Sequence, residues 1–317
     1  MNRIACWCLT GGFVLGMLIG CSPGGEAPSG SLSESEGQGS ESEVPTFYVV
    51  NYPLYYFTKR IVGEQARVVL PESSGADPAF WQPSEAEVME YQNADLILLW
   101  GADFAKWVQN VSLPLSRVID TGSSIRDRYI YDEEAVSHSH GDSEAHSHGA
   151  IAFTTWLDFE LMIHQSREIY KSISNRYPRH AVEYGQSYRA LEADLMSLDR
   201  TFNELIPESF DETVFASHPV YQYFGRRYGL EIQSFHWEPG VMPDEAEWNN
   251  FEDRLKENKV KWMLWEGAPS EETKARLQKS GVLPIEFHTV GGSPETGDFL
   301  TVMQANVERL RDALQAR

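Results

Sequence analysis

The sequence predicts an α/β protein with two lobes, each built on a parallel sheet, joined by a single long rigid helix. Short runs of aliphatic and β-branched residues alternate with helical patterns in the first half of the chain, and the same alternation returns in the second half. One unbroken helical pattern separates the two halves. Repeated strand–helix units favour parallel sheets, which bind ligands at the carboxyl ends of their strands and in the cleft between lobes.

The helix between the halves is predicted at residues 178–206, where apolar residues recur every three or four positions and so form one stripe. Pro178 suits a first helical position, and Pro207 disfavours helix at the residue before it. Such a helix is about 40 Å long, enough to serve two lobes, although one large domain is the alternative. The stripe consists of Ala181, Tyr184, Tyr188, Leu191, Leu195, Leu198, Phe202 and Leu205.

The alternating segments divide the chain into an N-terminal lobe at 46–177, the linking helix at 178–207 and a C-terminal lobe at 208–317. The predicted strands lie at 47–50, 68–70, 96–99 and 118–119, and then at 214–216, 232–235, 262–265 and 282–285. The predicted helices lie at 53–62, 84–91 and 102–108, and then at 220–228, 244–257, 270–279 and 297–316.

The first residues, MNRIACWCLTGGFVLGMLIGC, predict a signal peptide at 1–20, because a short apolar run follows one Arg and closes on small residues. The ending Leu18-Ile19-Gly20-Cys21 resembles the lipobox of bacterial lipoproteins, which implies cleavage before Cys21 and lipidation of its sulfur. An uncleaved anchor or an ordinary secretory signal is the alternative. Residues 21–45 are rich in Ser, Gly, Glu and Pro and predict a flexible acidic linker.

Composition excludes several classes of function. The net charge of −21 argues against a nucleic-acid partner and fits a soluble extracytoplasmic protein. Cleavage would remove Cys6 and Cys8, so the mature chain would keep Cys21 alone and form no internal disulfide. The sequence contains no nucleophile elbow, phosphate loop or His-Glu-x-x-His motif, so we expect that it is not an enzyme.

Four segments, in this order and spacing, resemble the solute-binding lipoproteins of bacterial zinc and manganese ABC importers, a metal-binding lipoprotein and adhesin family. They are NADLILLWGADF at 93–104, WLD at 156–158, ASHPVYQYFGRRYGL at 216–230, and GDFL at 297–300 leading to Met303 and Asn306. The resemblance implies two α/β lobes joined by a rigid helix, and capture of a divalent metal ion between them. It also implies delivery to an ABC permease from a lipid-anchored position in the periplasm or at the cell surface. We expect a monomer.

The resemblance also implies metal ligands, and two of the expected histidines are missing. Family members use three histidines, or two and a Glu, with a further carboxylate. Ala79 stands after Asp77-Pro78, where the first histidine is expected, and Thr154 stands two residues before Trp156, where the second is expected. Neither Ala nor Thr is a usual zinc ligand.

The remaining candidate ligands follow predicted strands of the second lobe. His218 stands where the resemblance implies the third histidine, Glu266 matches a cleft glutamate of many members, and His288 stands where the family has an Asp. Two imidazoles and a carboxylate suit Zn2+, with Mn2+ or another divalent cation as the alternative, and leave an open fourth position. His236 is a further candidate. For each of these residues the alternative is an ordinary hydrogen-bonded surface group.

The segment 137–149 carries two His-x-His pairs, His138 with His140 and His146 with His148. Imidazole binds zinc, copper and nickel, and in this family such a segment resembles an accessory that collects zinc near the main site. The hypothesis is that one of these histidines completes the coordination sphere; a solvated low-complexity loop is the alternative. The missing first-lobe ligands also leave open a different metal, a chelated ligand or an adhesin-like role.

Overall fold

The computed structural model describes residues 44–71, 78–131, 137–138, 146–147, 151–238 and 240–315. The predicted signal peptide, the linker and Cys21 lie outside these ranges, as do His140 and His148. The backbones of His138 and His146 pair in a short antiparallel ladder formed by β5 (Ser137–His138) and β6 (His146–Ser147).

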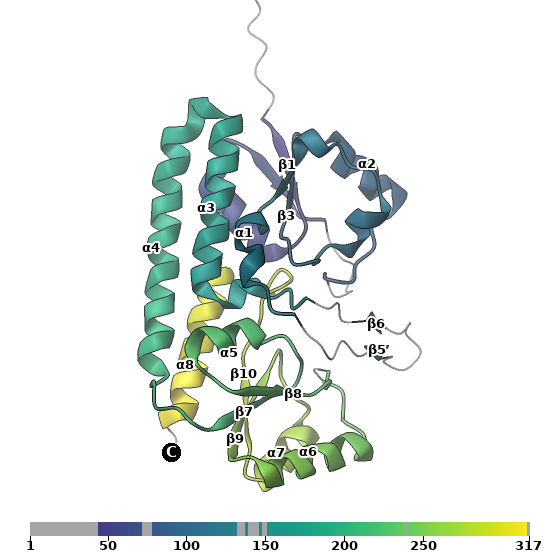
Figure 1. The fold of residues 1–317 in the computed structure, drawn as a ribbon, viewed down its shortest axis with the longest axis vertical. Coiled ribbons are helices and arrows are strands. Elements are labelled where there is room, and N and C mark those ends of the chain that lie inside the picture. Colours follow the sequence, from purple (N-terminus) through teal and green to yellow (C-terminus); the bar gives the residue numbers. More distant parts are fainter. Residues whose placement is uncertain are drawn as a thin grey trace, which may run out of the picture. The chain divides into compact units, whose positions relative to one another are not determined.

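The predicted fold class is confirmed: two separate four-stranded parallel sheets form the centres of two α/β lobes (Figure 1). The first has the order β2-β1-β3-β4, with every neighbouring pair parallel. Its strands are β1 (Thr46–Val49), β2 (Arg67–Val69), β3 (Leu96–Leu99) and β4 (Val118–Asp120).

The second sheet has the order β10-β9-β7-β8 and is also parallel throughout. Its strands are β7 (Thr213–Ala216), β8 (Ile232–Ser234), β9 (Val260–Trp265) and β10 (Leu283–Glu286). All four residues of the inner strand β7 are buried, which explains why its sequence lacks the polar alternation of a strand with one exposed face.

Local signals set the starts of most helices. Ser84 and Asp244 each form a capping box with the Glu three residues later, at the starts of α2 and α6. Asn51 accepts a hydrogen bond from the Leu54 amide and begins α1. The helices that cover the sheets are α1 (Tyr52–Val62), α2 (Glu85–Asn93), α5 (Gln222–Tyr228), α6 (Glu245–Glu257), α7 (Glu271–Lys279) and α8 (Phe299–Gln315).

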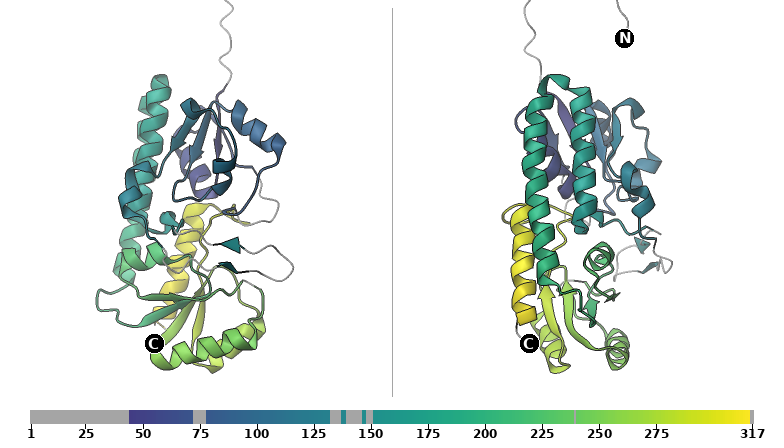
Figure 2. Two further views of the ribbon diagram at one scale, coloured as in Figure 1. Left: turned by 45° about the vertical axis from the view of Figure 1, so that its right-hand side comes forward. Right: turned by 60° about the vertical axis from the view of Figure 1, so that its left-hand side comes forward.

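The long helix is α4 (Ala181–Leu205), 25 residues in length. It begins after a single 3-10 turn, η5 (Pro178–His180), so its first turn lies three residues later than the sequence predicts. Six of the eight residues in the predicted stripe are buried, while Ala181 and Leu205 are half-buried. The helix packs on α1 and α3 beside the first sheet and on α8, which itself packs on β10 of the second sheet (Figure 2).

One long helix is absent from the sequence prediction. This is α3 (Phe159–Arg176), which lies alongside α4 (Figure 1). Asp158 caps it by accepting hydrogen bonds from the amides of Glu160 and Leu161. Its buried face includes Gln165 and Ser166, and these polar residues interrupt the apolar stripe that would otherwise have indicated the helix.

The predicted helix at 102–108 is wrong. The chain after β3 instead makes a turn in which Gly101, Ala102 and Asp103 all have positive φ, and only then enters the 3-10 turn η1 (Lys106–Asn110).

Within the described ranges, no helix combines the length and apolar character that crossing a membrane requires.

The aromatic ring of Phe202 joins α4 to the second lobe. Its centroid lies 5.3 Å from those of Phe224 and Tyr228 on α5, and 6.0 Å from that of Phe287 in the loop after β10. On the other side it lies 5.5 Å from Phe159 of α3. The side chain has no exposed surface, so this one ring fills the junction between three helices and a loop.

We predict that Phe202→Ala lowers the free energy of unfolding by about 3–5 kcal/mol, because it leaves a cavity at this junction. Met196→Ala, on the same helix but 55% exposed, is the matched control and should change it by less than about 0.5 kcal/mol. Urea denaturation followed by circular dichroism measures both. Equal effects of the two substitutions would contradict this account of the junction.

Candidate metal centre

The candidate ligands follow successive strands of the second sheet. Ala216 of β7 pairs with Leu264 of β9 and Ser234 of β8, and Trp265 of β9 pairs with Glu286 of β10. Since parallel strands end at the same edge of a sheet, the residues that follow them emerge side by side. Read from β10 to β8, this row is His288, Glu266, His218 and His236.

His218 lies near the middle of the row and is 7% exposed. The Ser217 amide donates to the Leu264 carbonyl at 2.8 Å and holds the loop against β9. The Nδ1 atom of His218 lies 3.7 Å from Oε1 of Glu238. Its ring centroid lies 5.9 Å from that of His236, with the rings at 85°. The imidazole of His236 and the carboxylate of Glu238 therefore both lie close to His218.

Glu266 and His288 lie together at the other end of the row. The hydroxyl of Thr289 donates to Oε1 of Glu266 at 3.0 Å, and Nε2 of His288 lies 3.9 Å from Oε2 of Glu286. Burial lowers the pKa of His288, and the positive charge of Arg309 lowers it further. Both effects favour the neutral imidazole, which is the form that binds metal.

The main chain of His288 is held by the fully buried Asn306 of α8. The His288 amide donates to Oδ1 of Asn306 at 3.0 Å, and Nδ2 of Asn306 donates to the His288 carbonyl at 2.8 Å. Sequence analysis places Asn306 in a family motif but does not reveal this role, because its partner lies 18 residues away in a loop of irregular conformation.

Tyr221 ties the two ligand loops together. Its hydroxyl donates to the Phe287 carbonyl at 2.7 Å, one residue before His288, while Tyr221 itself follows His218 by three residues. Complete burial raises the pKa of Tyr221 well above its usual value, and the negative charge of Glu266 adds to this effect. The loops after β7, β9 and β10 thus form one connected edge.

Among the described residues, no three His, Cys, Asp or Glu side chains are arranged to hold one metal ion. His218, Glu266 and His288 share an edge of the sheet, and their role as ligands stays a prediction. Ala79 is 4% exposed and Thr154 is 3% exposed. The positions where the resemblance implies first-lobe histidines therefore hold small, buried side chains.

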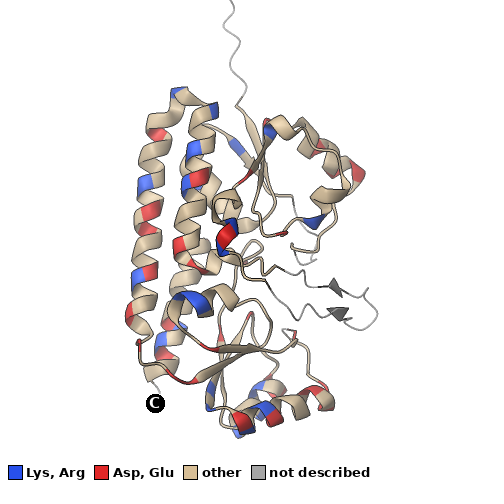
Figure 3. Ribbon diagram, in the orientation of Figure 1, with Lys and Arg blue, Asp and Glu red and all other residues tan. Residues whose placement is uncertain are grey.

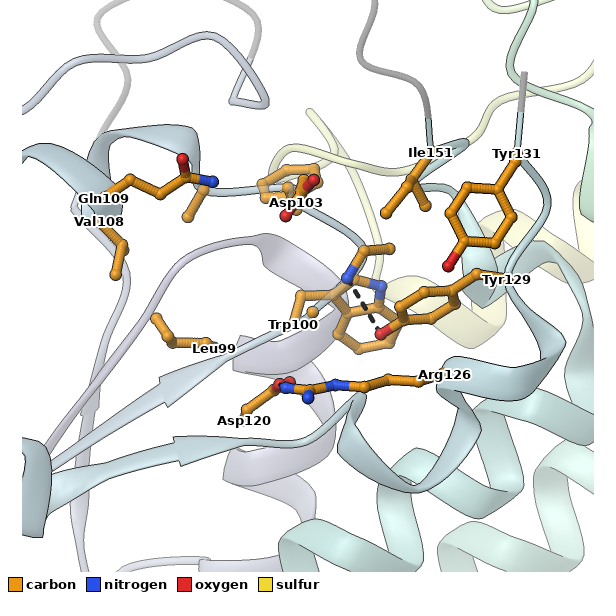
Figure 4. A pocket seen from close by; sticks show the side chains of 14 residues that line it. Leu99, Trp100, Asp103, Val108, Gln109, Asp120, Arg126, Tyr129, Tyr131 and Ile151 are labelled. Atoms are coloured by element: carbon orange, nitrogen blue, oxygen red, sulfur yellow. Dashed lines mark hydrogen bonds and ion pairs between the residues drawn. The ribbon is translucent and has the colours of Figure 1, made fainter. Parts of the chain in front are cut away.

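A hollow of about 300 Å³ lies in the first lobe at the end of β3 (Figure 4). Asp103, Tyr131 and Ile151 line its rim, and Asp120, paired with Arg126, lies across from them. Tyr131 and Ile151 also form an isolated antiparallel bridge, and the histidine-rich segment 137–149 lies between them in the sequence.

The turn behind this hollow is strained, because Ala102 and Asp103 have φ values of 50° and 55°. The Tyr129 hydroxyl holds it in place by accepting from the Ala102 amide at 3.0 Å and donating to the Gly122 carbonyl at 3.1 Å. Burial raises the pKa of Tyr129 to about 12, so the hydroxyl keeps the proton that it donates. A side chain at Gly122 would collide with this hydroxyl, since a Cβ there would lie 2.4 Å away.

Charged side chains of α5 fasten the second lobe to the first. Arg226 bonds to the buried Asp158 at 3.1 Å and to the Arg128 carbonyl at 2.6 Å. The next residue, Arg227, bonds to Glu160 at 2.7 Å and to Asp199 of α4 at 2.5 Å. These arginines form the basic stretch on α5 in Figure 3.

Two α/β lobes, each with a parallel sheet and in contact near the carboxyl edge of the second sheet, are the architecture of the two-lobed solute-binding proteins. The chain belongs to the family described as zinc-uptake complex component A, periplasmic (ZnuA), whose model matches residues 48–313. These relatives are transport proteins, in agreement with the expectation that the chain is not an enzyme.

Three relatives illustrate the similarity. The zinc-binding lipoprotein AdcA of Streptococcus pneumoniae strain R6 is 25% identical over 290 residues, which cover 88% of this chain and 57% of that protein. The chain thus spans little more than half of AdcA. The high-affinity zinc uptake system protein ZnuA of Bacillus subtilis strain 168 is 24% identical, with 90% and 92% covered. The Zn(II)-bound ZnuA-like domain of Streptococcus pneumoniae AdcA has the same fold, with a TM-score of 0.71, 20% identity, and 86% and 99% covered.

We predict that Arg226→Met lowers the free energy of unfolding by roughly 2–3 kcal/mol, somewhat less than the loss of a fully buried ion pair, because Arg226 is partly exposed. The substitution leaves the Asp158 carboxylate buried without its cation. Lys256→Met is the control, since its pair with Asp253 is exposed on both sides and should contribute little to stability. Thermal and urea unfolding measure both, and a loss no larger than that of Lys256→Met would refute the role of this ion pair.

Proposed function

We propose that this chain is the extracytoplasmic solute-binding lipoprotein of an ABC importer, and that it captures a divalent metal ion at the carboxyl edge of the second sheet. The observation that carries the proposal is the position of His218, a buried imidazole between two groups that each contain an imidazole and a carboxylate. The proposed ligands are His218, Glu266 and His288.

Zinc is the proposed metal. Imidazole nitrogen with one carboxylate is a donor set that suits zinc, whereas manganese prefers sites richer in carboxylate and water. The names of the relatives in Bacillus subtilis and Streptococcus pneumoniae, which refer to zinc uptake and zinc binding, support the same choice. Manganese or another divalent cation is the alternative.

The proposal includes attachment and delivery. Lipidation of Cys21 would anchor the chain, the linker at 21–45 would let the lobes stand away from the membrane, and an ABC permease would receive the ion. The lipobox pattern supports the anchor, and so does the description of the pneumococcal relative as a lipoprotein. The proposed working state is a monomer.

We predict that the full-length protein, stripped of metal with a chelator, binds about one zinc ion tightly and that His218→Ala weakens this binding by at least about 100-fold. Loss of a ligand should exceed the 10–100-fold effect of an outer-shell change. His164→Ala, an exposed histidine on α3, is the matched control and should bind zinc like the unaltered protein. Competition with a chromophoric chelator measures the affinities. Zinc binding by His218→Ala as tight as that of the unaltered protein would refute the proposal.

The same assay assigns the remaining ligands. Glu266→Gln and His288→Ala should each weaken zinc binding strongly, because each removes a proposed ligand. Glu238→Gln removes a carboxylate on the other side of His218 and should have the smaller effect. The reverse order would move the ligand set toward β8, to His236 and Glu238.

We further propose that the histidine-rich segment collects zinc for this site. Deletion of residues 137–149 removes four imidazoles and should lower either the zinc affinity or the number of ions bound in excess zinc. A variant in which the four histidines are replaced by Ser keeps the length of the segment and removes only the imidazoles. It therefore distinguishes an effect of the imidazoles from an effect of shortening the chain. Unchanged affinity and stoichiometry in both variants would reject the accessory role.

A further inference from the structure

Two side chains of the first lobe reach directly into the loops that carry the proposed ligands. The hydroxyl of Thr154, which is 3% exposed, donates to the Val220 carbonyl at 2.6 Å. Val220 follows His218 by two residues, and its own amide donates back to the His218 carbonyl at 2.9 Å. Thr154 therefore holds the turn that sets the position of the His218 main chain.

The second contact is made by Trp156. Its indole Nε1 donates to the Thr289 carbonyl at 2.6 Å, and the ring is 1% exposed. Thr289 directly follows His288, and its hydroxyl donates to Glu266. A Cβ added at Gly291 would lie 3.4 Å from the same indole ring, so this loop is packed against Trp156 as well as hydrogen-bonded to it.

The two contacts come from one short element, η4 (Thr155–Leu157), and the residue before it. Trp100 donates to the Thr155 hydroxyl at 2.7 Å, and that hydroxyl donates to Gln165 of α3 at 2.9 Å, so the element is fixed to the first lobe. Buried hydrogen bonds of this kind are costly to leave unmade, because neither the donor nor the acceptor can turn to water. The ligand loops are thus held from the opposite lobe by a rigid support.

We propose that Thr154 and Trp156 are positioning residues: they hold the loops that carry His218 and His288 in place from the first lobe, so that these loops keep their arrangement before the ion arrives. The proposal rests on the function proposed above for the same edge of the second sheet. Neither side chain is itself a ligand, since a Thr hydroxyl and an indole N–H are not zinc donors of the usual kind. In this proposal the first lobe holds the ligand loops in place, and the second lobe provides the side chains that bind the metal.

The test compares Thr154→Val with Thr154→Ser in the full-length protein. Val keeps the shape and removes the hydroxyl, while Ser keeps the donor. Thr154→Val should weaken zinc binding roughly 10-fold, the lower end of the range for outer-shell changes, and Thr154→Ser should restore most of it. The cobalt-substituted protein should show an altered d–d absorption spectrum for Val and an unaltered one for Ser. A spectrum that is the same in all three proteins would overturn the positioning role.

Hydrogen exchange of the metal-free protein gives an independent readout. Amides in 217–222 and 287–291 should be as protected without metal as with zinc, and Thr154→Val should expose the first of these segments. Trp156→Phe, which keeps a ring and removes the N–H, should expose the second and supplies a further variant if Thr154→Val folds poorly. Strong protection that appears only when zinc is added would overturn the inference, because the lobes would then close on the ion.

The two proposals fail in different ways. If the unaltered protein binds neither zinc nor cobalt, the proposed function fails, while exchange in the metal-free protein still decides whether Thr154 and Trp156 hold the loops. If His218→Ala abolishes binding but Thr154→Val leaves affinity, spectrum and exchange unchanged, the proposed function stands and the positioning role is refuted.

Discussion

One strand register decides where the chemistry of this protein lies. Ala216 of β7 is level with Leu264 of β9 and Ser234 of β8, so three parallel strands end together and their following residues emerge at one edge. A slip of one residue in β7 would turn its side chains to the opposite face of the sheet and take His218 out of the row. The main-chain hydrogen bonds between these strands therefore determine which residues lie at the candidate centre.

The register of the strands does not by itself fix the conformation of the loops that follow them. Hydrogen bonds from the first lobe hold these loops. Thr154 and Trp156 donate to the carbonyls of Val220 and Thr289, and the Tyr52 amide donates to the Gly291 carbonyl at 3.2 Å. From behind, Phe202 of α4 packs on Phe287, next to His288. The loops are therefore held on both sides, which limits the conformations that the ligands must give up when they bind an ion.

The sequence predicts the elements that depend on neighbouring residues, and it misses those that depend on contacts between residues distant in the chain. All eight predicted strands of the two sheets exist to within two residues at each end, because buried parallel strands are short apolar runs in any context. Helix α3 was missed because Gln165 and Ser166 occupy its buried face. The glutamine is explained by its hydrogen bonds to Trp100, Thr121 and Thr155, none of which lies on the helix. The turn at Ala102 escaped because its left-handed backbone depends on the Tyr129 hydroxyl, 27 residues away. The nearness of Glu238 to His218 likewise arises from strand pairing, which no spacing in the chain reveals.

The fold and the donor set are determined by different residues, and here they can be separated. The family model matches residues 48–313, whereas Ala79 and Thr154 stand where the resemblance implies the histidines of the first lobe. In the proposed site His218, Glu266 and His288 all come from the second lobe, and Thr154 and Trp156 of the first lobe contribute hydrogen bonds to the loops that carry them. The residues that make the fold and the residues that would bind the ion can therefore be changed independently of one another.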